Sequence, residues 1–273
     1  MTKSAIEKNK SQSRILEADI RKEPRKASSD RFVPRIGLLL LFMEVWKQFY
    51  LYYMVFHKSY QVWYFPFQLC SMPIYLCLLY GFLSYREKQA RRIDASAAAA
   101  VTAAHASDFE DTASAPSLSS KLLPVLALFL RDYGVLGGIA ALIVHAGFTW
   151  PDHPLLTMHG YLWHIILILL GALLTRHGLC PKGLRSFWRT VPLFLLLSAM
   201  AEGINVLLHP YGDCDMFYIS PYHLSSQPVF HQIDAVIGRI PGIAVYLTCV
   251  VLGAFLVHGC FCIWEKRKAS ISA

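Results

Sequence analysis

The chain has 273 residues, of which 55% are hydrophobic and only 16% are charged. Soluble domains carry about 25% charged residues, so this composition argues against an ordinary soluble domain. The formal net charge of +8 is concentrated between apolar segments, which indicates membrane topology and not a nucleic-acid-binding face. The seven Cys include no CxxC pair, so neither a disulfide framework nor a structural zinc site is expected.

The first segment, residues 1–31, is polar, basic and rich in Ser. It lacks the apolar core of a cleavable signal peptide, and this composition predicts a disordered tail. Membrane insertion must then depend on the internal segments. The sequence predicts a membrane domain over residues 32–265 and a short second tail over residues 266–273.

Six apolar segments follow that have about the length needed to cross a bilayer, which is about 20 residues. In chain order they are Ile36–Phe56, Trp63–Ser84, Leu122–Phe148, Met158–Thr175, Trp188–Leu208 and Ile240–Cys262. The expected fold class is all-α, a polytopic membrane protein with a six-helix transmembrane bundle. Pro154 precedes the shortest segment and fits the first turn of a helix that begins earlier.

The Lys and Arg residues predict the orientation of these spans. They occur in both tails and in the loops after the second and fourth spans, whereas the opposite side carries only Lys58 and Arg239. The positive-inside rule therefore predicts that both termini are cytosolic, and the endoplasmic reticulum or another internal membrane is favoured. The cytosolic loop 87–120 is rich in Ala and Ser and is expected to be flexible.

Nucleophilic and ionisable residues inside the spans are the best candidates for a functional site, because each needs a partner or a wet cavity. At 1.5 Å per helical residue, Cys70 and Glu202 lie about 10 Å below the non-cytosolic surface, His164 about 9 Å and Asn205 about 5 Å. We expect these four residues to line one cavity. There His164 would take the proton of the Cys70 thiol, and Asn205 or Glu202 would orient the imidazole.

Each of these residues also has a structural interpretation. A lone Cys in a membrane helix is usually an apolar filler, and His164 fits an interhelical hydrogen bond. A metal site built from His153, His159 and His164 is a rival, but His159 and His164 lie about 140° apart on one helix. No metal ligand and no cofactor is therefore assigned. Glu44 and Lys47 are one helical turn apart and are expected to neutralise each other.

The order of several short motifs resembles the YwaF-like integral membrane family, which includes acyltransferases of the transmembrane protein one-sixty-four type. The motifs are Glu44 with Trp46, the segment Pro66–Cys70, the stretch Gly134–Gly138, His164 with Gly171, Glu202–Asn205, and Met216–Pro221. The resemblance covers about residues 35–264. It implies a helical bundle related to the androgen-induced-gene hydrolases, with Cys70 as nucleophile and His164 as base. The chain departs from the family at Asp213–Asp215 and in lacking an extra first helix.

The sequence thus predicts a membrane phospholipid acyltransferase that moves a fatty acyl group through an acyl-cysteine intermediate at Cys70. Its expected partners are a membrane phospholipid and a lysophospholipid, and no nucleic acid. Two alternatives remain open from the sequence: a metal-dependent lipid hydrolase that uses the same cavity, and a non-enzymatic transporter or scaffold.

Overall fold

The computed structural model describes residues 30–103 and 117–271 of the chain. Within these ranges the protein is all-α, with seven α-helices and no strand, which confirms the all-α part of the predicted fold class. The helices are α2 (Phe32–Tyr50), α3 (Met72–Ala103), α4 (Leu118–Ile143), α5 (Pro154–Arg176), α6 (Val191–Leu208), α7 (Pro228–Ile237) and α8 (Arg239–Ile271).

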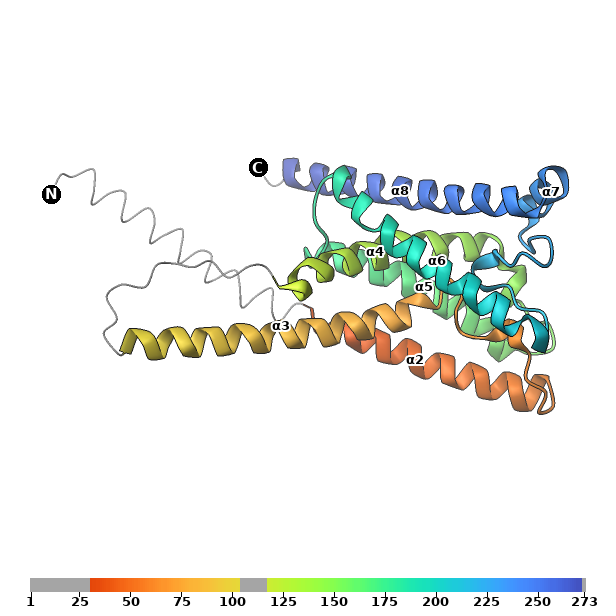
Figure 1. The fold of residues 1–273 in the computed structure, drawn as a ribbon, viewed down its shortest axis with the longest axis horizontal. Helices are drawn as coiled ribbons and strands as arrows, with labels where there is room; N and C mark the ends of the chain where they lie inside the picture. The colour runs from red at the N-terminus through yellow and green to blue at the C-terminus, as the bar shows by residue number, and fades with distance from the viewer. Residues whose placement is uncertain (1–29, 104–116, 272–273) are drawn as a thin grey trace.

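The six long helices lie side by side and alternate in direction along the long axis of the molecule (Figure 1). Helices α2, α4 and α6 run one way, and α3, α5 and α8 run the other way. The short helix α7 lies at the end of the bundle where α8 begins. This is the up-and-down arrangement of a helical bundle with short connections.

Four helical segments are long and apolar enough to cross a membrane: Leu118–Ile143, Pro154–Arg176, Leu184–Tyr211 and Arg239–Lys268. Only 11% of the most apolar window of the last segment is buried inside the protein. An apolar surface of this length is unfavourable in water but favourable against lipid chains. The protein is therefore a multi-pass integral membrane protein.

Helices α2 and α3, which correspond to the first two predicted spans, are less apolar than these four segments. Helix α2 carries Arg35, Glu44 and Lys47, and the second half of α3 is polar. Both helices still belong to the bundle and pack along each other.

The second predicted helix begins later than expected, at Met72 and not at Trp63. A helix that began at Trp63 would hold Pro73 in its interior, where proline removes a hydrogen bond and clashes with the preceding turn. At the observed start, Pro73 lies in the first turn, which tolerates it. Cys70 consequently lies in the turn before α3 and not on a helix, which corrects the position expected for it.

Other boundaries differ mainly at the helix ends. The first predicted span ends in a π-helix, Leu51–Val55, and the third in a 3-10 turn, His145–Phe148. Helix α5 begins at Pro154, as predicted from the proline. The short helix α7 was not predicted.

The predicted loop and tails are partly helical. Helix α3 continues to Ala103, so the first part of the predicted flexible loop 87–120 is helical, while residues 104–116 lie outside the described residues. Helix α8 continues to Ile271 and includes most of the second predicted tail. The first tail, apart from its last residues, lies outside the described residues.

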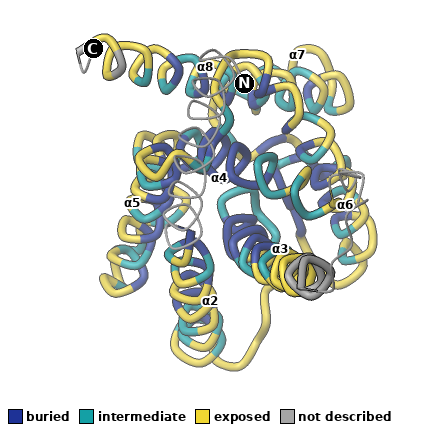
Figure 2. The backbone as a smooth tube through the Cα atoms, turned by 90° about the vertical axis from the view of Figure 1, so that its left-hand side faces the viewer, coloured by how far each residue is buried: buried dark blue, intermediate teal, exposed yellow. Residues whose placement is uncertain are grey.

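Helix α4 lies at the centre of the bundle, and Figure 2 shows much of its backbone in the colour of buried residues. Every residue from Leu126 to Val135 is buried, including the charged residues Arg131 and Asp132. Helix α5 approaches α4 closely because Gly171 has no side chain: a Cβ there would lie 2.3 Å from a methyl carbon of Val135. Small residues at such contacts allow the close packing that holds membrane helices together.

Candidate functional site

A cluster of polar side chains lies on the buried face of α2. Glu44 is only 4% exposed, and its Oε1 atom accepts a hydrogen bond from Gln48 (2.7 Å) and lies 2.8 Å from the Lys47 ammonium. The expected neutralisation of Glu44 by Lys47 is confirmed. The Gln48 amide also donates to the carbonyl of Tyr64. Such pairing is needed because an isolated buried carboxylate is strongly unfavourable.

Helix α5 joins this cluster to the turn that carries Cys70. The Nε2 atom of His159 lies 3.2 Å from the carbonyl of Met43 on α2. The His159 ring stacks on Trp46 and on Trp163, with ring centroids 5.5 Å and 5.6 Å apart. Trp163 in turn donates its indole N–H to the Cys70 carbonyl at 3.1 Å. The His159 ring and the Cys70 backbone thus share one aromatic neighbour.

Cys70 itself is a free, partly exposed thiol. It packs at the edge of a small apolar cluster that includes Leu40 and Trp163. Glu44 and Lys47 are the charged side chains that act most strongly on the Cys70 thiol. Cys70 therefore packs against an apolar cluster, within the electrostatic reach of the Glu44–Lys47 pair.

His164 directly follows Trp163 on α5 but makes different contacts. Its Nδ1 atom is 2.7 Å from the Gly160 carbonyl, so Nδ1–H donates and Nε2 carries the lone pair. The ring stacks on Phe148, 4.9 Å away. Among the hydrogen bonds of the described residues, none joins the Cys70 thiol to the His164 ring. The imidazole linked to Cys70 through Trp163 is that of His159, which the sequence suggested only as a metal ligand.

Asn205 was expected to orient a histidine, but its side chain binds a backbone turn. Its Oδ1 atom accepts the Met216 N–H at 2.6 Å, and its amide donates to the Met216 carbonyl at 3.1 Å. The amide also lies 3.3 Å from the carboxylate of Glu202, one turn earlier, so the two side chains share one face of α6. Cys70, His164, Asn205 and Glu202 were expected to line one cavity. Among the hydrogen bonds of the described residues, the one that joins two of these four side chains is that between Asn205 and Glu202.

Gln68 holds the same turn from the opposite side. Its amide donates to the Asp215 carbonyl (2.8 Å), and its carbonyl accepts the Phe217 N–H (2.9 Å). Phe217 and Tyr218 both adopt positive φ angles, 57° and 58°, a conformation that is unfavourable for bulky residues. The two side-chain amides therefore stabilise a strained turn next to Cys70.

The chain before α8 closes this end of the bundle. Arg239 donates to the carbonyls of Ser220 (2.6 Å) and Tyr218 (3.0 Å) and to the Asp234 carboxylate (2.6 Å). Burial raises the pKa of Asp215, and the Ser220 N–H and the positive charge of Arg239 partly offset this rise. No local sequence pattern predicts these contacts, because the partners come from separate turns.

No three His, Cys, Asp or Glu residues in the described ranges are grouped as a metal site would require. His153, His159 and His164 thus do not form the rival metal site in the described geometry. What the arrangement offers is a thiol, two imidazoles and a buried ion pair at one end of the bundle. This set is suited to proton transfer and nucleophilic attack.

Comparison with known proteins adds no further assignment: no protein-family model, no curated protein and no solved structure matches this chain. The resemblance to the YwaF-like family is carried by the short motifs alone.

Proposed function

We propose that the protein is a membrane enzyme that transfers a fatty acyl group from a phospholipid to a lysophospholipid through an acyl-cysteine at Cys70. The observation that carries this proposal is the link from the Cys70 carbonyl through the Trp163 indole to the His159 ring, which also contacts α2, the helix that carries the Glu44–Lys47 ion pair. A nucleophile with a nearby imidazole and a charged group that can stabilise it is the usual arrangement for acyl transfer.

In the proposed first step, an imidazole takes the thiol proton and the sulfur attacks the ester carbonyl of a phospholipid. A C–S bond forms, the ester C–O bond breaks, and the leaving alkoxide takes the proton to give a lysophospholipid. In the second step, the hydroxyl of another lysophospholipid attacks the thioester carbonyl: a C–O bond forms, the C–S bond breaks, and the hydroxyl proton passes through the imidazole to the sulfur. The acyl group is thus conserved, and no cofactor is consumed.

Two imidazoles qualify as the base. His164 is favoured by the motif resemblance and by its Nδ1–H bond to Gly160, which leaves Nε2 ready to accept a proton. His159 is favoured by its shared contact with Trp163 and by its place beside the Glu44 cluster. Separate substitutions of the two would identify the base by the larger loss of turnover.

We further propose that α2 and α3 also cross the membrane, which gives six spans with both termini in the cytosol, in an internal membrane. Support comes from the alternating directions of the six long helices (Figure 1). The basic residues of α3 lie in the half of the helix that runs toward the same end of the molecule as the basic end of α8, as the positive-inside rule requires.

The test is acyl-thioester trapping on the purified protein supplied with a radiolabelled phospholipid. We expect a hydroxylamine-sensitive label on the wild type, and on Cys249→Ala, because Cys249 is an exposed thiol on α8. Cys70→Ala should lose both the label and acyl transfer. Transfer at the wild-type rate by Cys70→Ala would refute the mechanism.

A further inference from the structure

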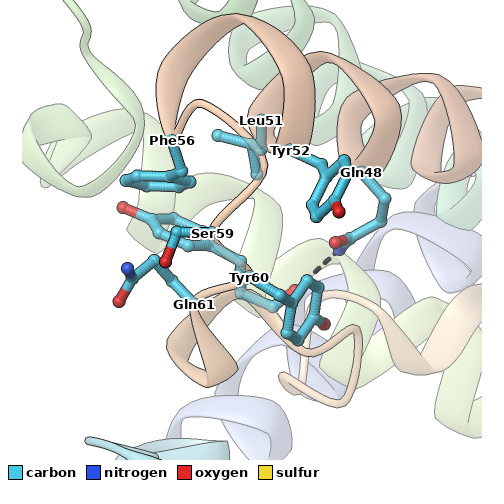
Figure 3. A pocket seen from close by; sticks show the side chains of 8 residues that line it. Gln48, Leu51, Tyr52, Phe56, Ser59, Tyr60 and Gln61 are labelled. Atoms are coloured by element: carbon cyan, nitrogen blue, oxygen red, sulfur yellow. Dashed lines mark hydrogen bonds between the residues drawn. The ribbon is translucent and has the colours of Figure 1, made fainter.

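A cationic loop, residues 176–189, joins α5 to α6 at the end of the bundle where α8 ends (Figure 1). It contains neither Asp nor Glu. Its four exposed cations are Arg176, Lys182, Arg185 and Arg189. At the opposite end of the bundle, the hollow between the side chains drawn in Figure 3 has no room for a water molecule. The cationic loop is therefore the more open surface for a ligand.

The cations of the loop have no acidic partner. None of the four forms an ion pair with a described residue. On α3, by contrast, Lys88 lies 2.8 Å from Asp30, and Arg91 lies 2.9 Å from a neighbouring carboxylate of the same helix. The positive-inside rule accounts for basic residues at this end of the molecule, but paired cations satisfy it equally. The unpaired cations of the loop leave a surplus of positive charge that an anion can neutralise.

The backbone of the loop is held in place by the helices behind it. Phe187 is fully buried, and its ring lies 5.3 Å from that of Phe255 and 5.6 Å from that of His258, both on α8. The Ser186 hydroxyl donates to the Gly183 carbonyl at 2.7 Å, and Gly183 has a φ angle of 92°, which favours glycine. Because the backbone is already ordered, binding of a ligand costs less entropy.

The loop lies where two candidate membrane spans meet the water. The span before it ends at Arg176, and the next span begins at Leu184. Leu184 and Trp188 are 50% and 59% exposed. Large exposed apolar side chains beside cations are typical of segments that enter the head-group layer of a membrane. The anions nearest to the cationic loop are then lipid head groups, which favours a lipid over an acidic protein.

We propose that the cationic loop binds a phospholipid whose head group carries a phosphomonoester, such as a phosphorylated phosphatidylinositol, in the leaflet on its side of the membrane. Three of the four cations are Arg, whose planar guanidinium binds phosphate through two parallel hydrogen bonds. A phosphomonoester also carries about −1.5 to −2 charges at neutral pH, so it neutralises more of the loop than a singly charged head group does. In the proposed topology this leaflet is cytosolic, which is the anionic side of a membrane.

The test is a calorimetric titration of the purified protein in a maltoside detergent, with each lipid below its micelle concentration. The probes are the dioctanoyl forms of a phosphatidylinositol monophosphate, phosphatidylserine and phosphatidylcholine. We expect the phosphatidylinositol monophosphate to bind about tenfold more tightly than phosphatidylserine, because of its additional charge. Phosphatidylcholine, which has no net charge, should not bind at this site.

Two double variants with the same loss of charge locate the site. Lys182→Gln with Arg185→Gln should weaken binding of the phosphorylated lipid about thirtyfold, from about fivefold for each cation. The matched control is Arg92→Gln with Lys121→Gln, which removes two exposed cations of α3 and α4 at the same end of the bundle. This control should bind nearly like the wild type. So should Cys70→Ala, because the cationic loop lies at the end of α5 opposite to the Cys70 turn, and this result is independent of the acyl transfer.

Each outcome decides the proposal. Equal affinity of the wild type for the phosphorylated lipid and phosphatidylserine overturns it, and so does equal weakening in the two double variants. Free inositol bisphosphate that binds as tightly as the lipid would make the loop a site for a soluble phosphate. A polyglutamate peptide that binds as tightly would make it a docking surface for an acidic protein, and either result also overturns the proposal. If the loop variant does not fold, Arg176→Gln with Arg189→Gln replaces it.

Discussion

At the scale of single residues, the most costly feature is a buried charge network in the middle of the bundle. Arg131 and Asp132 are 1% and 0% exposed, and the Arg131 Nε donates to Asp132 at 2.7 Å. His258 of α8 lies within hydrogen-bond distance of both charged groups. The three residues tie α8 to the central helix α4, so their main role is structural.

Removing the negative charge of Asp132 should therefore strongly destabilise the protein. Asp132→Asn leaves the Arg131 charge buried without its partner, and breaking a buried ion pair costs about 3–5 kcal/mol. We expect a large drop in the melting temperature of the detergent-solubilised protein. Asp152→Asn, in an exposed turn before α5, is the matched control and should melt like the wild type. Equal melting of the two variants would mean that the network contributes no stability.

The side-chain amide of Gln68 also stabilises the fold, but by a smaller free energy than the Asp132 carboxylate. Gln68→Ala removes two hydrogen bonds to residues 215–217, each of which contributes about 0.5–1.5 kcal/mol. The melting temperature should fall by several degrees, and acyl transfer should fall with it because Cys70 is two residues away. Gln61→Ala, at an exposed position, should change neither quantity. Full activity in Gln68→Ala would show that the turn is not needed for chemistry.

At the scale of helices, the contact between α2 and α3 depends on two glycines. A Cβ at Gly37 would lie 2.7 Å from the Cβ of Cys77, and one at Gly81 would lie 2.6 Å from the Cβ of Pro34. Both distances are too short for unstrained carbon atoms. The two helices can therefore approach each other only where these side chains are absent.

A side chain at this contact should force the helices apart. Gly37→Val is expected to destabilise the protein by about 1–3 kcal/mol, the usual cost of overpacking, as measured by thermal melting. Gly203→Ala on α6 is the control, because a Cβ there meets no atom within 4 Å, and alanine favours the helix. A Gly37→Val protein as stable as the wild type would contradict the observed helix packing.

The helices also show where sequence reasoning succeeds. All six predicted spans correspond to long helices, because each contains a long apolar run that can be recognised locally. The start of α3 was wrong because the apolar residues 63–71 were counted as helix despite Pro73. Gln68 was missed, and His159 was considered only as a metal ligand, because their partners lie far away in the chain, 147 and 116 residues from them. Hydropathy carries no information about such contacts.

At the scale of the whole molecule, the number of spans can be tested directly. Ser59 lies exposed between α2 and α3, and Ser270 lies near the end of α8. In sealed vesicles of a cysteine-depleted protein, an impermeant maleimide should reach Ser59→Cys only from the non-cytosolic side. It should reach Ser270→Cys only from the cytosol. Labelling of both positions from the same side would exclude α2 and α3 as spans.

The paired amides around residues 215–217 have a consequence for the path of a lipid chain. Gln68 precedes α3 and Asn205 belongs to α6, and both are hydrogen-bonded to the same short backbone segment. Separating these two helices would break at least one of the two pairs of bonds, so we expect them to move together. In the proposed acyl transfer, an acyl chain that reaches Cys70 from the bilayer would then have to pass the opposite flank, where His159 and Trp163 of α5 contact α2 and the Cys70 backbone.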